Sequence, residues 1–189
     1  MNVIRMNNIR PQIVLLRGAS AAGKTAVAKS LLLYLKDNLK KNCAFISEDN
    51  FRKKMQFNCK AEDKKVHLNS VKLITRIIKE LSSLGNYEVI VIEGLFRYKE
   101  MINEYKSFAK RSKYNLQIFQ LVAPLELRRK RNRISSVRDH ISNLDSEHGR
   151  GKGEEVPIKD SVVINTVETI DTSVKLIASY LEQKSFQKL

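Results

Sequence analysis

The chain has 189 residues, of which 42% are hydrophobic and 29% are charged. This composition is typical of one globular domain and excludes a disordered chain. No apolar run reaches the ~18 residues that a membrane-spanning helix needs, and the polar segment 1–11 lacks the apolar stretch of a secretory signal. Two cysteines are too few for a disulfide framework, so we expect a reduced, cytoplasmic protein. Because no apolar run is long enough, we expect no contact with a membrane.

The formal net charge of +15 is the unusual bulk feature. It implies attraction to anions such as nucleotides, nucleic acid or an acidic surface. Because the lysines are scattered while the arginines cluster, a lysine-rich composition without any anionic partner explains the charge equally well. The sequence leaves nucleic acid open as a partner, and it leaves the oligomeric state open as well.

Segments typical of strands alternate along the chain with segments typical of helices. Strands are expected at 13–16, 43–46, 89–92, 116–122 and 162–164, and helices at 24–39, 68–84, 99–113, 125–135 and 171–186, with a short helix and a loop over 51–66. The run 89–92 is β-branched throughout, which is typical of a strand buried on both faces of a parallel sheet. The alternation predicts an α/β fold with a five-stranded, mostly parallel sheet covered by helices on both sides. We expect a single domain over residues 1–189, because no linker or repeat divides the chain.

Residues 18–25 read GASAAGKT and fit the phosphate-binding pattern G-x-x-x-x-G-K-[ST] without a gap. A predicted strand precedes them and a predicted helix follows, which is the context that this loop needs. Its backbone amides would turn inward at the positive end of the helix and form an anion site. The residues expected to hold the nucleotide are Gly18, Ala21, Ala22, Gly23, Lys24 and Thr25. Lys24 is expected to reach the β- and γ-phosphates, and the Thr25 hydroxyl to bind Mg²⁺.

The second predicted strand is followed by a candidate catalytic pair. Ligands of open α/β sheets bind beyond the carboxyl ends of the strands, which is where Asp49 is expected. Its carboxylate could accept the proton of an acceptor hydroxyl and orient the oxygen for in-line attack. Arg52, three residues on, could share a helical face with Asp49 and grip the acceptor or the transferring phosphate. The alternative is that Asp49 caps a short helix beginning near Phe51, and Glu48 is a competing carboxylate.

The third predicted strand supplies a candidate metal ligand, whereas the histidines do not. Glu93 ends this strand at the place of a Walker B acid, where it could hold Mg²⁺ through a water or contact the acceptor. The alternative is a solvated acid at the end of a strand. The histidines His67, His140 and His148 have no metal-ligand spacing, and each is expected at the surface or in a loop.

The densest cationic run lies on the predicted helix 125–135. Arg129 and Arg133 are four residues apart and fall on one helical face. We expect both to close over the nucleotide and offset the charge of the transferring phosphoryl group, with Arg138 as a weaker third candidate. The alternative is a solvated helix face or a patch that binds nucleic acid.

At these positions the chain resembles the P-loop kinases of small molecules and nucleic acids. Gly18–Thr25 resembles their Walker A loop, and the segment 47–52, SEDNFR, resembles their D-x-[FY]-R segment. In polynucleotide kinases the aspartate of that segment is the general base and the arginine contacts the acceptor side, so the resemblance implies these roles for Asp49 and Arg52. It also implies the three-layer α/β/α fold of P-loop NTPases.

Other segments of the chain resemble different members of these kinases. The segment 123–126, APLE, which leads into the arginine helix, resembles the entry to an Arg-rich lid over about residues 125–157. The strand ending 92–94, IEG, is closer to uridine and pantothenate kinases, and the layout is shared with chloramphenicol phosphotransferase and zeta-toxin kinases. The glycine- and charge-rich segment 146–157 matches none of their substrate-binding patterns.

Together these features predict an ATP-dependent kinase that uses Mg²⁺. It would transfer the γ-phosphoryl group to a hydroxyl of a small molecule or of a nucleic-acid or nucleoside acceptor. The alternative is a nucleotide-dependent switch or a nucleic-acid-binding ATPase without a dedicated acceptor. No base-reading motif distinguishes ATP from GTP.

Overall fold

A computed structural model describes residues 10–55, 63–134 and 158–186. Five strands form one sheet in the order β2-β3-β1-β4-β5, and each neighbouring pair is parallel. The strands are β1 (Gln12–Gly18), β2 (Cys43–Ser47), β3 (Val89–Gly94), β4 (Asn115–Val122) and β5 (Val162–Asn165). The predicted five-stranded parallel sheet is therefore confirmed, and the carboxyl ends of its strands lie along one edge.

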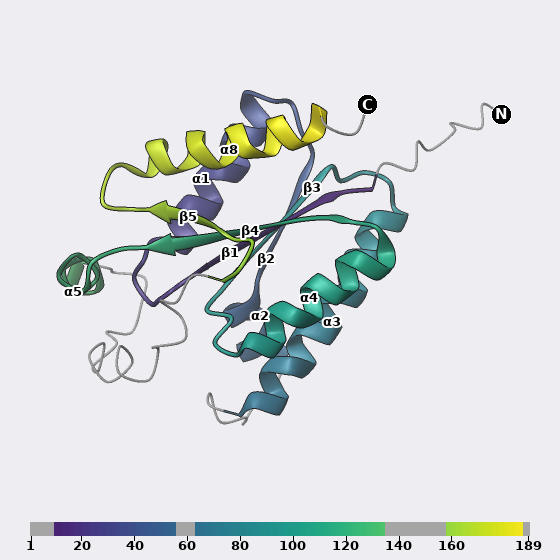
Figure 1. Cartoon of the computed structure of the whole chain (residues 1–189), viewed down its shortest axis with the longest axis horizontal. Helices are drawn as coiled ribbons and strands as arrows, with labels where there is room; N and C mark the ends of the chain where they lie inside the picture. The colour runs from purple at the N-terminus through teal and green to yellow at the C-terminus, as the bar shows by residue number, and fades with distance from the viewer. Residues whose placement is uncertain (1–9, 56–62, 135–157, 187–189) are drawn as a thin grey trace.

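Helices cover both faces of the sheet and make the predicted three layers (Figure 1). Helices α1 (Lys24–Asp37) and α8 (Ile170–Phe186) lie on one face, and α3 (Lys64–Ser83) and α4 (Lys99–Ser112) lie on the other. The shorter helices α2 (Glu48–Met55) and α5 (Leu125–Ile134) follow β2 and β4 at the carboxyl edge. None of the described helices combines the length and the apolarity that a membrane crossing requires.

The central strand β1 explains why the sheet has a core on each face. Val14 and Leu16 pack into the cluster under α1 and α8, while Ile13 and Leu15 pack into the cluster under α3 and α4. All four side chains are fully buried. Alternation of side chains along a strand thus turns one continuous apolar run into two cores, as expected for a parallel sheet.

Two helix starts differ from the sequence prediction. Helix α2 begins at Glu48, three residues before Phe51, so Asp49 lies inside the first turn. The alternative that Asp49 caps a helix beginning near Phe51 is therefore wrong. Helix α3 begins at Lys64 because the Asp63 carboxylate caps it, accepting hydrogen bonds from the backbone amides of Lys65 and Val66 at 2.8 and 3.4 Å.

The predicted lid is described only in its first part. Helix α5 carries the arginine run, while residues 135–157, with Arg138, His140 and His148, lie outside the described residues. The lid over about 125–157 therefore stays a prediction.

Candidate active site

The phosphate-binding loop is shaped by two glycines at its ends. A Cβ atom on Gly18 would lie 2.4 Å from the backbone oxygen of Leu121 in β4, so only glycine lets the loop start this close to its neighbour. Gly23 precedes α1 in the left-handed conformation, with a φ of 95°. The buried Lys24 folds back across the loop, where its Nζ donates a hydrogen bond to the Ala19 oxygen at 3.0 Å. The start of α1 therefore faces the loop with backbone amides and an ammonium group, a combination suited to phosphate.

Oxygen ligands from three elements meet beside the loop. The Thr25 hydroxyl at the start of α1 donates to Glu93 Oε2 at 3.2 Å, and the Ser47 hydroxyl at the end of β2 donates to Glu93 Oε1 at 2.7 Å. Glu93 is only 3% exposed, so the alternative of a solvated strand-end acid is wrong. Hydroxyl and carboxylate oxygens are the hard ligands that Mg²⁺ prefers.

This oxygen cluster is too small to hold a metal with protein ligands alone. Among the described residues, no three His, Cys, Asp or Glu side chains gather where they could bind one ion. Mg²⁺ in nucleotide sites commonly takes one or two protein ligands and completes its shell with phosphate oxygens and water. The donor set of Thr25 and Glu93 fits that arrangement.

Asp49 and Arg52 lie together on α2, as their spacing predicts. The Arg52 guanidinium contacts Asp49 Oδ1 through Nη2 at 3.3 Å and approaches Glu48 Oε1 through Nε at 3.6 Å. Arg52 is buried, whereas the Asp49 side chain is 28% exposed. One guanidinium thus bridges two carboxylates of one helix, and the carboxylate that reaches solvent is Asp49.

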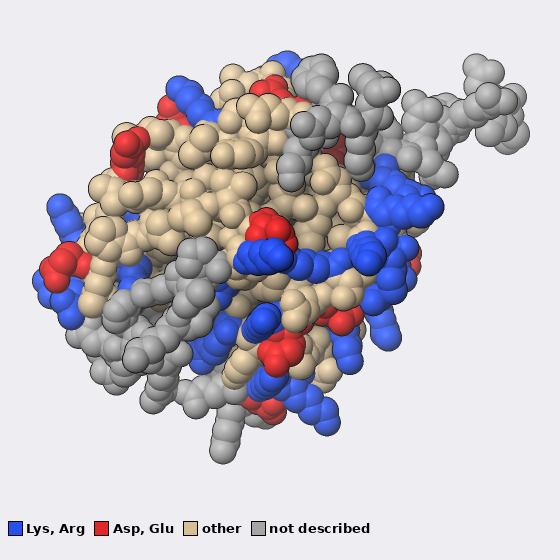
Figure 2. Space-filling model, in the orientation of Figure 1, with Lys and Arg blue, Asp and Glu red and all other residues tan. Residues whose placement is uncertain are grey.

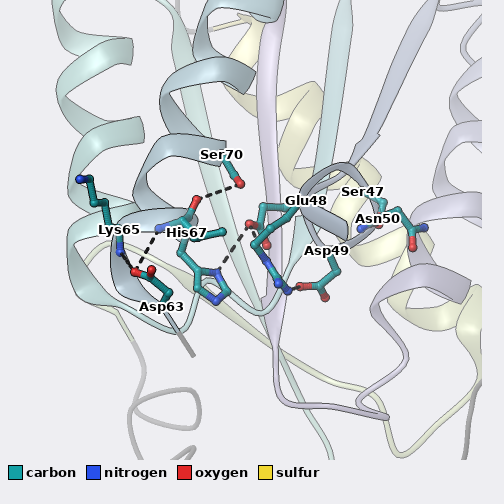
Figure 3. Close-up of polar contacts among 10 residues, drawn as sticks. Ser47, Glu48, Asp49, Asn50, Asp63, Lys65, His67 and Ser70 are labelled. Carbon is teal, nitrogen blue, oxygen red and sulfur yellow. Dashed lines mark hydrogen bonds and ion pairs between the residues drawn. The ribbon is translucent and has the colours of Figure 1, made fainter. Parts of the chain in front are cut away.

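His67 is buried, which corrects the expectation of a surface or loop histidine. It lies in the first turn of α3 and is 2% exposed, with its Nδ1 3.7 Å from Oε1 of the fully buried Glu48 (Figure 3). Burial raises the pKa of the Glu48 carboxyl, although the neighbouring His67 and Arg52 act in the opposite direction. Gly94 makes room for this cluster, because a Cβ there would lie 3.0 Å from the Cβ of Glu48.

Arg131 on α5 contacts the phosphate-binding loop. Its Nη1 donates to the Thr166 hydroxyl at 3.1 Å and to the Ala22 oxygen at 3.5 Å, and its Nη2 donates to the Thr166 backbone oxygen. Thr166 follows β5 and itself donates to the Ala22 oxygen at 2.9 Å. Arg131 therefore ties α5 and the end of β5 to the loop that would hold phosphate.

The two arginines predicted from helical spacing lie elsewhere on α5. Arg129 forms an ion pair with Glu126 at 3.0 Å and its side chain is 37% exposed, and Arg133 is exposed. Their roles in phosphoryl transfer stay predictions. Sequence reasoning missed Arg131, since nothing in the pattern of α5 says which of its charged faces meets the loop.

Comparison with known proteins identifies the domain type and the fold. The family model AAA_33, which describes an AAA domain, matches residues 13–150. The solved structure of the Mycobacterium tuberculosis APS kinase CysC in complex with AMPPNP and APS superposes with a TM-score of 0.72 at 14% identity, covering 92% of this chain and 98% of that one. APE1195 gives 0.71 at 19% identity with 93% and 96% covered, and a gluconokinase from Sinorhizobium meliloti 1021 gives 0.66 at 13% identity with 95% and 99% covered. A search of curated proteins found no match. At these identities the solved structures establish a shared fold.

Proposed function

Because the chain belongs to the AAA_33 family and has the fold of P-loop kinases, we propose that it is an ATP-dependent kinase. It would transfer the γ-phosphoryl group of ATP to a hydroxyl of a small molecule or of a nucleic-acid or nucleoside acceptor, with Mg²⁺. The observation that carries this proposal is the contact between Asp49 and Arg52. Both residues lie on α2, which begins directly after Ser47, the residue of β2 that donates to Glu93. A nucleotide switch needs the loop and the metal ligands, but it does not need a carboxylate–arginine pair to bind and deprotonate an acceptor. The domain would span residues 1–189, with a lid over about 125–157.

In this proposal the residues around the loop bind and orient ATP. The amides at the start of α1 and the Lys24 ammonium hold the phosphates, because both carry positive charge into a buried site. Thr25 and Glu93 would hold Mg²⁺, which when bound neutralises phosphate charge and fixes the phosphate geometry. Arg131 keeps the loop in place from the side of α5.

The residues on α2 act on the acceptor. Asp49 accepts the proton of the acceptor hydroxyl, so that the oxygen can attack the γ-phosphorus in line with the leaving oxygen. Arg52 holds Asp49 through Nη2 and offers its remaining N–H donors to the acceptor or to the phosphoryl group in transfer. Arg129 and Arg133 are proposed to offset the charge on that group when α5 approaches the nucleotide.

Labelled ATP distinguishes this proposal from the alternative. The protein, γ-labelled ATP and Mg²⁺ are incubated with a panel of 5′-hydroxyl oligonucleotides, nucleosides, sugars and aminocyclitols, and the labelled product is identified. The proposal expects label on one acceptor class. Release of labelled phosphate without any labelled acceptor would instead support an ATPase or switch.

The distribution of charge favours a polyanion as the acceptor or as a further ligand. Helices α3 and α4 carry nine basic and three acidic residues, whereas α1 and α8 carry four basic and three acidic residues when the loop residue Lys24 is left aside. Figure 2 shows the basic side chains gathered over the face formed by α3 and α4. A lysine-rich composition without a partner would not prefer one face of the sheet. Nucleic acid is the polyanion that such a surface would attract.

Salt dependence tests this second candidate. Binding to a single-stranded oligonucleotide is expected to weaken by roughly 0.7 log units per log of salt for each phosphate contact. Reversing Lys72 and Arg76 on α3 to glutamate should weaken binding, while reversing Lys29 and Lys36 on α1 is the matched control, because both pairs are exposed. Equal losses from the two pairs, or no binding at low salt, would remove nucleic acid from consideration.

A further inference from the structure

A buried charged cluster lies next to the proposed acceptor site. It consists of Glu48 and Arg52 on α2 and His67 on α3, which are 0%, 9% and 2% exposed. A carboxylate without access to water is costly unless cations compensate it. Replacing Glu48 by an apolar residue would avoid that cost, so its presence calls for a role.

Glu48 and Asp49 share one guanidinium, and Glu48 has a further partner in His67. Arg52 approaches Glu48 through Nε at 3.6 Å and Asp49 through Nη2 at 3.3 Å. In Figure 3 the Glu48 carboxylate lies between the His67 imidazole and the Asp49 side chain. Without His67, Arg52 alone would compensate the buried Glu48, and the guanidinium would be drawn away from Asp49.

The remaining neighbours of Glu48 do not stabilise its carboxylate. From α4, the fully buried Tyr105 faces the cluster, and burial raises the pKa of its phenol, so it stays neutral. The ring of Tyr98 contacts the His67 ring edge-on, with centroids 5.4 Å apart. Besides Arg52, His67 is therefore the described group that favours the charged form of Glu48.

We propose that Glu48 and His67 are positioning residues for phosphoryl transfer. His67 holds the Glu48 carboxylate, Glu48 holds the Nε edge of Arg52, and Arg52 thereby presents Nη2 to Asp49 and its other donors to the acceptor. This inference rests on the proposed function, because it assumes that Asp49 and Arg52 serve the acceptor. It assigns a role to two residues that touch neither nucleotide nor acceptor.

The test uses full-length protein with Glu48→Gln, His67→Gln and both changes together. The matched control is Thr75→Val, since Thr75 is also buried on α3 and its hydroxyl donates only within that helix, to the Lys72 oxygen at 2.9 Å. We expect kcat for acceptor phosphorylation to fall about 10- to 100-fold in each single variant, because small misplacements of catalytic groups have effects of that size. The double variant should be no worse than the poorer single variant, because both act through one contact. Nucleotide Kd should stay within about twofold in all variants and in the control.

Stability separates positioning from a merely structural role. Because burial raises the pKa of Glu48, its protonated carboxyl group favours the folded state below the ordinary glutamate range, and this contribution is lost as the pH rises. Near pH 7, Glu48→Gln is therefore expected to match or exceed the unfolding midpoint of the wild type while being less active. A variant that loses stability, nucleotide affinity and kcat in parallel would overturn the proposal.

The position of the Arg52 side chain can be measured by NMR in the absence of any acceptor. We expect the ¹⁵N NMR resonance of its Nε–H, assigned by its loss in Arg52→Lys, to shift in His67→Gln as well as in Glu48→Gln and to stay unchanged in Thr75→Val. An unchanged resonance in His67→Gln would overturn the inference whatever reaction the protein catalyses. If the resonance shifts but no acceptor receives label from ATP, the proposed function fails and the positioning contact stands.

Discussion

Replacing Arg131 with alanine is expected to weaken nucleotide binding about tenfold. Arg131 contacts the loop oxygen of Ala22 at 3.5 Å and makes two closer contacts to Thr166, which follows β5. Alanine removes all three contacts and leaves only the Thr166 hydroxyl, at 2.9 Å, to hold the Ala22 oxygen. The loop then has to be ordered by the nucleotide itself, and the free energy for this is subtracted from binding.

The magnitude follows from the two contacts to Thr166. A hydrogen bond of this kind contributes about 0.5–1.5 kcal/mol, so the pair contributes about 1–3 kcal/mol. Arg131 is half-buried, and water can take over part of its role at the carbonyl oxygens. If about half of the upper estimate of 3 kcal/mol is lost from the free energy of nucleotide binding, the loss is ~1.4 kcal/mol, which is tenfold in Kd.

A titration with a fluorescent ATP analogue measures this effect. The matched control is Arg129→Ala on the same helix, whose 3.0 Å ion pair with Glu126 is exposed and contributes about 0–1 kcal/mol. Its Kd should change by less than about twofold, and its predicted role in transfer is measured separately as kcat. If Arg131→Ala binds the analogue as tightly as the wild type, Arg131 does not hold the loop.

Three further predictions test residues on the strands of the sheet. Gly94→Ala should lower the free energy of unfolding by about 1–3 kcal/mol in a urea titration, because the new Cβ lies 3.0 Å from that of Glu48; an unchanged midpoint would mean that the cluster relaxes freely. Glu93→Gln should raise the Mg²⁺ concentration needed for half-maximal transfer about 10- to 100-fold, and an unchanged requirement would exclude it as a metal ligand. Burial raises the pKa of the Cys43 thiol from 9.0 to about 11, so alkylation at pH 8 in a Cys59→Ser background should be about 100-fold slower than in urea; equal rates would contradict that shift.

The sheet and the loop could be predicted because their signals are local. Five apolar runs separated by helical segments are enough to place parallel strands, and G-x-x-x-x-G-K-[ST] after a strand fixes the loop at 18–25. The carboxyl edge then follows from topology alone, which is why Asp49, Arg52 and Glu93 could be placed there in advance. The contact of Arg52 with Asp49 at 3.3 Å agrees with their spacing.

The burial of His67 was missed although a signal existed. His67, Val71, Ile74 and Ile78 follow one another at spacings of four, three and four, so His67 continues the apolar stripe of α3. Its residue type argued for the surface, but Glu48 supplies a buried partner from a helix that precedes it in the chain. A partner of this kind depends on how α2 and α3 pack, which periodicity within one helix does not contain.

The contact of Arg131 with the phosphate-binding loop could not be predicted from the sequence. Helix α5 has arginine or lysine on most of its faces and no apolar stripe, so its orientation is set by tertiary contacts. Spacing favoured Arg129 and Arg133 because they share a face, yet the face turned toward the loop is the one that carries Arg131. The deciding partner, Thr166, lies 35 residues further along the chain.

Phosphate transfer by Asp49→Asn tests the proposed kinase most directly. The variant keeps the shape of the side chain and removes its ability to take a proton, so we expect transfer from labelled ATP to the acceptor to fall at least about 100-fold. Nucleotide Kd should be unchanged, because the groups proposed to hold the phosphates are the loop and Lys24 on α1. Transfer by Asp49→Asn at the rate of the wild type would contradict the assignment of Asp49 as the general base.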